Sequence, residues 1–273
     1  MDKISLEKAV ARNVKDLIID APPASLSATF LDFSRLIQPR EGQLIGRNLY
    51  IYSGAGAGQD RIVTSFDPAN NRLSFDQAFG SIPSTNSNCV LFNQYEKVDY
   101  DNAVDRLMGR AQLFYYQEAV ATLALSATQY EYAVPSGFKF IERLHIVPSG
   151  HTDYGADDES QRLFEIPWHK WLIGGNAGGT RLIVFDPRKI DLYWLNNESI
   201  KVTGQRRVDA LGTDNATVPE DLEEYVIEGA TMLLYRQKID SEEEFNRKFK
   251  YSQITFSALE EQIRSHIYGR EVG

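Results

Sequence analysis

The first hundred residues change from a helical to a strand-like hydrophobic pattern. In residues 1–24, apolar side chains at helical spacing predict an amphipathic helix over residues 5–19, with Ser5 as N-cap, before a proline-containing linker. In residues 25–99, short apolar runs between turn residues predict a small antiparallel β module. The Asp-Pro-Ala-Asn-Asn stretch at 67–71 predicts a hairpin turn there, because each of these residue types favours a particular turn position.

The rest of the chain repeats this change once and then returns to a helical pattern. Apolar spacing predicts a connecting helix over residues 100–125, and β-type runs predict a second β module over residues 126–210. Residues 211–273 are predicted to be helical, with capping boxes at Thr217–Glu220 and Ser241–Glu244. The expected fold class is therefore α+β, in which antiparallel sandwich-like or barrel-like β modules are joined by a helix and followed by C-terminal α-helices.

Two groups of residues are candidate interface positions. The last predicted helix carries an apolar seam with three- and four-residue spacing, formed by Phe245, Phe249, Phe256, Leu259 and Ile263. Such a seam packs against another helix, either in the same chain or in a neighbouring subunit, and the pattern leaves both open. Arg206 and Arg207 are the second group, since guanidinium groups suit carboxylate partners. We expect this pair to contact a subunit rather than DNA, and a solvent-exposed or ion-paired role is the alternative.

The glycine-rich stretch at 53–61, Ser-Gly-Ala-Gly-Ala-Gly-Gln-Asp-Arg, superficially resembles a phosphate-binding loop. A P-loop requires Lys followed by Ser or Thr, whereas Gln59 and Asp60 occupy these places. A dinucleotide-binding loop would open a helix, but the residues that follow are strand-like. The sequence therefore predicts a turn between two strands and no nucleotide. The second glycine-rich stretch, at 173–181, fails the same test, and we expect it to be a mobile or interface loop.

No other motif predicts catalysis, a metal or a cofactor. The acidic stretch at 151–159 could hold calcium, but it lacks the EF-hand pattern, so we expect a solvated loop. The four histidines lie far apart, and no nucleophile elbow or zinc motif occurs. The tryptophans could form a sugar platform, although core or interface positions are expected; they are Trp168, Trp171 and Trp194. A carbohydrate-binding β protein is thus the alternative from another functional class.

Charge and composition narrow the function further. The formal net charge of −9 argues against a surface that grips nucleic acid, but it permits a surface that nucleic acid slides past. No apolar run reaches the length of a membrane span, and the N-terminus has no signal-peptide core. The single cysteine, Cys89, is expected in the core and suits synthesis in a reducing interior. The 14 Tyr and 14 Phe suit β-rich folds and wide protein interfaces.

The order of segments in the C-terminal third resembles the head–tail connector and adaptor proteins of tailed bacteriophages. A strand-rich segment ends in Ser-Ile-Lys-Val-Thr-Gly-Gln-Arg-Arg-Val-Asp-Ala-Leu (199–211), and a Pro-x-x-acidic helix and an acidic helix follow. The N-terminal β module, with its Gly-Gln-x-Arg-x-Ile turn, also resembles a module of phage virion proteins. The resemblance covers residues 5–100 and 180–265 at the level of pattern.

This resemblance implies a non-enzymatic virion protein of the head–tail junction. It implies a ring, commonly of twelve copies, that lies beneath the portal protein, joins it to tail or neck proteins and lets DNA pass without sequence-specific binding. It also implies that the C-terminal helical region docks onto the portal. Another neck, tail-completion or fibre-attachment role remains the alternative within the virion.

Overall fold

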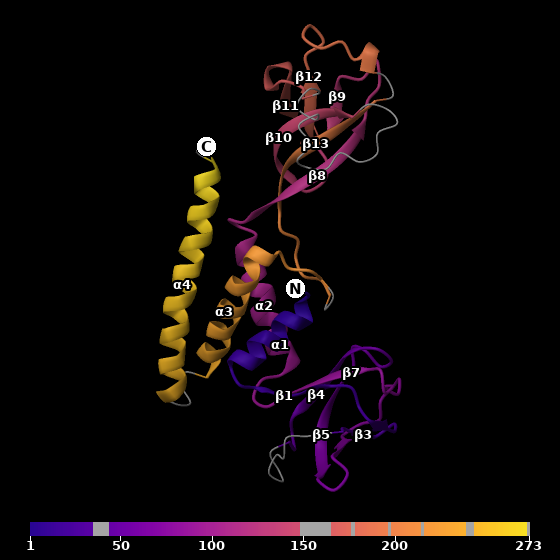
Figure 1. Ribbon diagram of the computed structural model, residues 1–273, viewed down its shortest axis with the longest axis vertical. Coiled ribbons are helices and arrows are strands. Elements are labelled where there is room, and N and C mark those ends of the chain that lie inside the picture. Colours follow the sequence, from indigo (N-terminus) through magenta and orange to yellow (C-terminus); the bar gives the residue numbers. More distant parts are fainter. Residues whose placement is uncertain are drawn as a thin grey trace. The chain divides into compact units, whose positions relative to one another are not determined.

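The computed structural model confirms an α+β fold with antiparallel sheets and C-terminal helices (Figure 1). It describes residues 1–34, 44–147, 165–175, 178–195, 198–213, 216–238 and 243–271, with the side chains of the last helix described to residue 264. The chain divides into two compact units. The first unit combines Met1–Ala111 with Ala210–Gly273, and the second is Gln112–Asp209. The N-terminal helix therefore belongs with the C-terminal helices in one unit, rather than to a separate N-terminal segment.

The first helix is shorter than its hydrophobic pattern predicts. Helix α1 spans Lys3–Asn13, and the side chain of Asp2, not Ser5, caps it by accepting a hydrogen bond from the Ser5 backbone N–H. Lys15 then adopts a φ of 59°, in the left-handed region, which ends the helix. Strand β1, Leu17–Ala21, follows immediately, so the last residues of the predicted helix are extended.

An antiparallel sheet of seven strands follows, in the order β1-β7-β4-β5-β6-β3-β2. The other six strands are β2 (Ser25–Leu26), β3 (Phe30–Asp32), β4 (Asn48–Ser53), β5 (Asp60–Asp67), β6 (Arg72–Phe75) and β7 (Asn88–Phe92). The hairpin predicted at 67–71 joins β5 to β6, where Asn71 has a φ of 49°. Alternate strand residues form a buried core that includes Leu31, Leu49, Ile51 and Cys89.

The predicted connecting helix over 100–125 is wrong in its second half. Helix α2 spans Lys97–Ala111, and Tyr116–Ala124 is strand β8. Alanine, glutamine and glutamate favour a helix here, but β8 pairs along its whole length with the last strand of the second unit. Tertiary pairing therefore decides the conformation of this segment, and the second β module begins before residue 126.

The second unit contains two three-stranded antiparallel sheets. One has the order β10-β13-β8, with β10 at Phe138–Val147 and β13 at Ser199–Arg207. The other has the order β11-β12-β9, formed by Trp171–Gly175, Arg181–Phe185 and Glu131–Ala133. Buried residues from both sheets, including Tyr132, Leu144, Ile183 and Val202, share one core. Part of the second glycine-rich stretch is thus strand β11 rather than loop.

The C-terminal helices are α3, Glu220–Gln237, and α4, Glu243–Glu271. The capping box predicted at Thr217–Glu220 does not form: Pro219 is the N-cap residue without a side-chain hydrogen bond, and Thr217 forms a β-bridge with Asp2. Ser241, of the second predicted box, lies outside the described residues. Helix α3 packs against three other helices, α1, α2 and α4 (Figure 1).

Asp16 connects the helices of the first unit to its sheet. Its side chain is buried between α1 and β1, and it accepts hydrogen bonds from the backbone N–H groups of Gln94 and Tyr95 and from the Tyr100 hydroxyl. These donors lie where β7 ends and α2 begins. Burial raises the pKa of Asp16, and the hydrogen bonds from Tyr100 and the backbone oppose that rise.

A second buried carboxyl group lies between α1 and α2. Glu7 is fully buried, with its Oε2 2.9 Å from Lys97 Nζ. Lys97 also lies 2.7 Å from Asp101, and Lys3 bridges Asp101 and Asp105 at 3.0 and 2.8 Å. Two lysines face two other carboxylates, so the cluster is neutral when Glu7 is protonated. Burial accordingly raises the pKa of Glu7 to about 9, despite the opposing charge of Lys97.

The crossing of α2, α3 and α4 predicts a strong requirement for glycine at position 229. A Cβ there would lie 2.5 Å from Leu107 Cδ1 and 2.6 Å from Phe256 Cε2. We expect Gly229→Ala to lower the free energy of unfolding by about 1–2 kcal/mol in urea titrations, since overpacking outweighs the gain in helix propensity. Gly109→Ala on α2 is the matched control, because its Cβ meets nothing within 4 Å. It should raise the free energy of unfolding by about 0.5–1 kcal/mol. Equal effects of the two substitutions would contradict the tight crossing.

The raised pKa of Glu7 predicts a pH dependence of stability. The folded state holds this proton more tightly than the unfolded chain, so Glu7 contributes stability that is fully present below its ordinary pKa and is lost as pH rises toward about 9. Glu7→Gln should remove this contribution to the pH dependence of the free energy of unfolding. We therefore expect the stability of the variant relative to the natural protein, measured by urea unfolding, to increase between about pH 5 and pH 9. Parallel pH profiles for the two proteins would show that Glu7 is ionised throughout this range.

Candidate functional site

The glycine-rich stretch at 53–61 is a turn between β4 and β5, as the sequence predicts. Gly54, Gly56 and Gly58 have φ values of 83°, 80° and 86°, which side chains disfavour. The Gln59 side chain fills the turn: its amide nitrogen donates to the carbonyls of Gly56 and Ser81, and its oxygen accepts from the Gly80 N–H. Within the turn, the N–H groups of Ala57, Gly58 and Gln59 donate to backbone carbonyls, so these donors are not available to a phosphate.

The other candidates for chemistry do not converge on a catalytic centre in the described part of the chain. No group of three or more His, Cys, Asp or Glu among the described residues could hold a metal ion. His145 is buried, with its Nδ1 unpartnered and its pKa lowered by burial, whereas His169 is exposed. The acidic stretch at 151–159 lies outside the described residues, as does the side chain of His266.

The tryptophans of the proposed sugar platform differ in exposure. Trp168 is 81% exposed. Trp171 is half-buried, and its indole N–H donates to the Ile166 carbonyl. The side chain of Trp194 lies outside the described residues.

The arginine pair lies at the end of β13, in the second unit. Arg206 is 3.5 Å from Asp209 in an ion pair, and Arg207 is exposed. Consecutive strand residues point to opposite faces of a sheet, so the two guanidinium groups do not form one binding fork. The pair also belongs to a different unit from the apolar seam of the last helix.

The apolar seam of α4 faces α3 within the same chain. Phe256 is 3% exposed, and its ring centroid lies 4.9 Å from that of Tyr225. Phe245 stacks near Tyr235 at 6.1 Å, and the three other seam residues are half-buried: Phe249, Leu259 and Ile263. Of the two possibilities left open by the spacing, packing within the chain therefore accounts for Phe245 and Phe256.

The outer face of α4 carries two exposed apolar residues that the seam pattern did not identify. Tyr251 is 74% exposed and Ile254 is 72% exposed, one turn apart. Their i, i+3 spacing places them on one side of the helix. The sequence contains this spacing, but two apolar residues form a weaker periodic pattern than the five residues of the seam. We call Tyr251 and Ile254 the outer face of α4.

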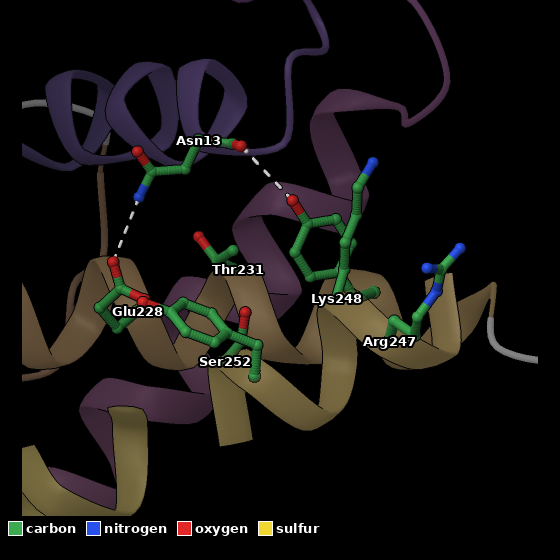
Figure 2. A pocket seen from close by; sticks show the side chains of 8 residues that line it. Asn13, Glu228, Thr231, Arg247, Lys248 and Ser252 are labelled. Carbon is green, nitrogen blue, oxygen red and sulfur yellow. Dashed lines mark hydrogen bonds between the residues drawn. The ribbon is translucent and has the colours of Figure 1, made fainter. Parts of the chain in front are cut away.

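A pocket of about 430 Å³ lies next to this face (Figure 2). Its walls come from the end of α1, the middle of α3 and the first half of α4. The lining residues are Asn13, Glu228, Thr231, Tyr235, Arg247, Lys248, Tyr251 and Ser252. Asn13 connects two of the walls, since its side-chain amide lies 3.5 Å from Glu228 and its carbonyl accepts from the Tyr235 hydroxyl at 3.4 Å.

The pocket has an acidic end and a basic end. Glu228 lies at one end, where burial and the charge of Glu224 raise its pKa. Arg247 and Lys248 lie at the other end (Figure 2). Lys248 forms an ion pair with Glu244, with 2.6 Å between Nζ and Oε1.

The described helices include none with the length and apolar character of a membrane span.

A family model described as SU10 adaptor protein matches residues 98–270, from α2 through the second unit to α4. No curated protein sequence is similar enough to this chain to match it. Because the family model covers more than half of the sequence, the chain belongs to the SU10 adaptor protein family, whose members are phage structural adaptor proteins.

Proposed function

We propose that this protein is the head–tail adaptor of a tailed bacteriophage virion, made in the host cytoplasm. Copies of the chain, commonly twelve, form a ring between the portal protein and the tail or neck proteins, and the ring surrounds a channel for DNA. The observation that carries this proposal is the match of residues 98–270 to the adaptor family.

The charge of the chain supports passage of DNA rather than binding. Basic surfaces hold DNA because they release its counterions, and this gain falls as the number of neutralised phosphates falls. With a formal net charge of −9, the chain lacks an overall basic surface. A ring of such subunits would repel the DNA backbone, which keeps a passing duplex mobile.

We assign portal binding to the C-terminal helices, but to their outer face rather than to the phenylalanine seam. The seam residues Phe245 and Phe256 are occupied by α3, whereas Tyr251 and Ile254 are exposed. Tyrosine and other large side chains are enriched at protein interfaces. Arg207, exposed at the end of β13, and its neighbour Arg206 remain our candidates for contact between subunits.

The arrangement of α4 determines which variants can test this assignment. Deletion of residues 241–273 would uncover Tyr225 and the small-residue surface of α3 around Gly229, so the first unit would be destabilised as well. Substitutions on the outer face leave the seam in place and are the sharper test.

We expect Tyr251→Asp and Ile254→Asp each to weaken binding to purified portal rings by about tenfold or more, because a charge would be buried in an apolar contact. Light scattering of the natural protein alone and with portal rings should show a ring assembled on the portal in fixed stoichiometry. Gln253→Asp is the control, since Gln253 is an exposed polar residue on the same helix. If the natural protein did not bind portal rings but bound purified tails, the protein would lie lower in the neck, next to the tail. Undiminished portal binding by both outer-face variants would remove α4 from the interface.

A further inference from the structure

The pocket beside the outer face of α4 has features of a site built for a specific side chain. Thr231 lies in its centre with Ser252 below it in the view of Figure 2, and Asn13 and Glu228 close one side. All of these residues belong to the first unit. The pocket therefore exists within one chain and needs no second copy to complete it.

Thr231 is the first sign of an absent ligand. It is 4% exposed, and its hydroxyl has no hydrogen-bond partner among the described residues. A buried hydroxyl without a partner is energetically unfavourable, so such groups are rare in folded proteins. A polar group entering the pocket from outside would remove this cost.

Glu228 is the second sign. Its carboxylate is half-buried, it has no cation within ion-pair distance in the described part of the chain, and its contact with the Asn13 amide is long, at 3.5 Å. Partial burial without a cation is unfavourable for a carboxylate, and the nearby charge of Glu224 adds to the cost. A cation next to Glu228 would relieve both effects.

The aromatic wall fits the same ligand. Tyr251 lines the pocket, although its side chain is 74% exposed, and Tyr235 lines it from α3. A guanidinium or ammonium group over the face of a tyrosine ring is attracted by the ring's π electrons. Arg247 and Lys248, at the opposite end, would repel a cation from that side, so a basic group in the pocket would lie at the Glu228 end.

We propose that this pocket receives one basic side chain, an arginine or lysine of the portal protein, with Glu228 as its ion-pair partner, Thr231 as a hydrogen-bond acceptor and Tyr251 as an aromatic wall. Arginine fits better than lysine, because its planar fork can donate to the carboxylate and to the hydroxyl together. This inference rests on the proposed function, and it adds the chemistry that the portal must present next to the outer face of α4.

Charge-neutral variants separate this role from simple charge effects. Glu228→Gln keeps the shape of the pocket and removes its carboxylate. Glu220→Gln makes the same charge change at an exposed position of the same helix, outside the pocket, and serves as the matched control. Thr231→Val removes the buried hydroxyl and keeps the volume of the side chain.

Binding to purified portal rings should fall about tenfold or more for Glu228→Gln and a few-fold for Thr231→Val, and should stay unchanged for Glu220→Gln. Urea unfolding of each variant should match that of the natural protein or exceed it, since Glu228→Gln removes a desolvated charge. This readout excludes loss of fold as the cause of weaker binding.

Other outcomes would overturn the inference. Portal binding that is unchanged by Glu228→Gln but lost in Tyr251→Asp would reject the basic side chain and leave the proposed function intact. Suppose that Glu228→Gln lowered the molar mass of the protein measured alone, compared with the natural protein, and left its affinity for portal rings unchanged. The occupant of the pocket would then be a second copy of this chain. Failure of the natural protein to bind portal rings would overturn both the inference and the proposed function.

Discussion

The first unit depends on one buried carboxylate, that of Asp16. The turn between α1 and β1 and the turn between β7 and α2 lie far apart in the sequence, and both have backbone N–H groups that need acceptors. The Asp16 carboxylate, in the first turn, accepts hydrogen bonds from backbone N–H groups of the second turn. It also accepts a hydrogen bond from the Tyr100 hydroxyl. Since a desolvated charge is tolerated only when it is fully hydrogen-bonded, these contacts fix where α1 and α2 leave the sheet. The packing of α3 on both helices follows from that geometry.

The sequence predicted the elements whose patterns are local. The hairpin at 67–71 and the turn at 53–61 both formed, because Asp, Asn and Gly determine turn geometry through their own backbone preferences. The end of α1 and the start of β8 were missed for the opposite reason. Residues 116–124 have helical propensity, and only their pairing with β13 makes them a strand.

The candidate site was harder to predict than the fold. The spacing of Phe245 and Phe256 showed that α4 has an apolar side, but periodicity cannot say which helix covers it. The pocket draws Asn13, Glu228, Thr231 and Tyr251 from three separate segments, and each is an ordinary polar or aromatic residue in its own sequence context. Thr231 and Glu228 indicate a binding site because their polar groups are buried or half-buried without suitable partners in the described part of the chain. No sequence pattern encodes this property.

The entry and exit of the second unit have a consequence for how the protein can vary. Tyr116, near its start, pairs with Arg207, near its end, and Gln112 donates to the Val208 carbonyl, so the chain leaves the helices and returns to them at neighbouring points. A domain attached in this way is a cassette inserted between α2 and α3, and its folding makes few demands on the host unit. Evolution or an engineer could exchange this cassette, or shorten it to a linker, and retain the helices and their pocket.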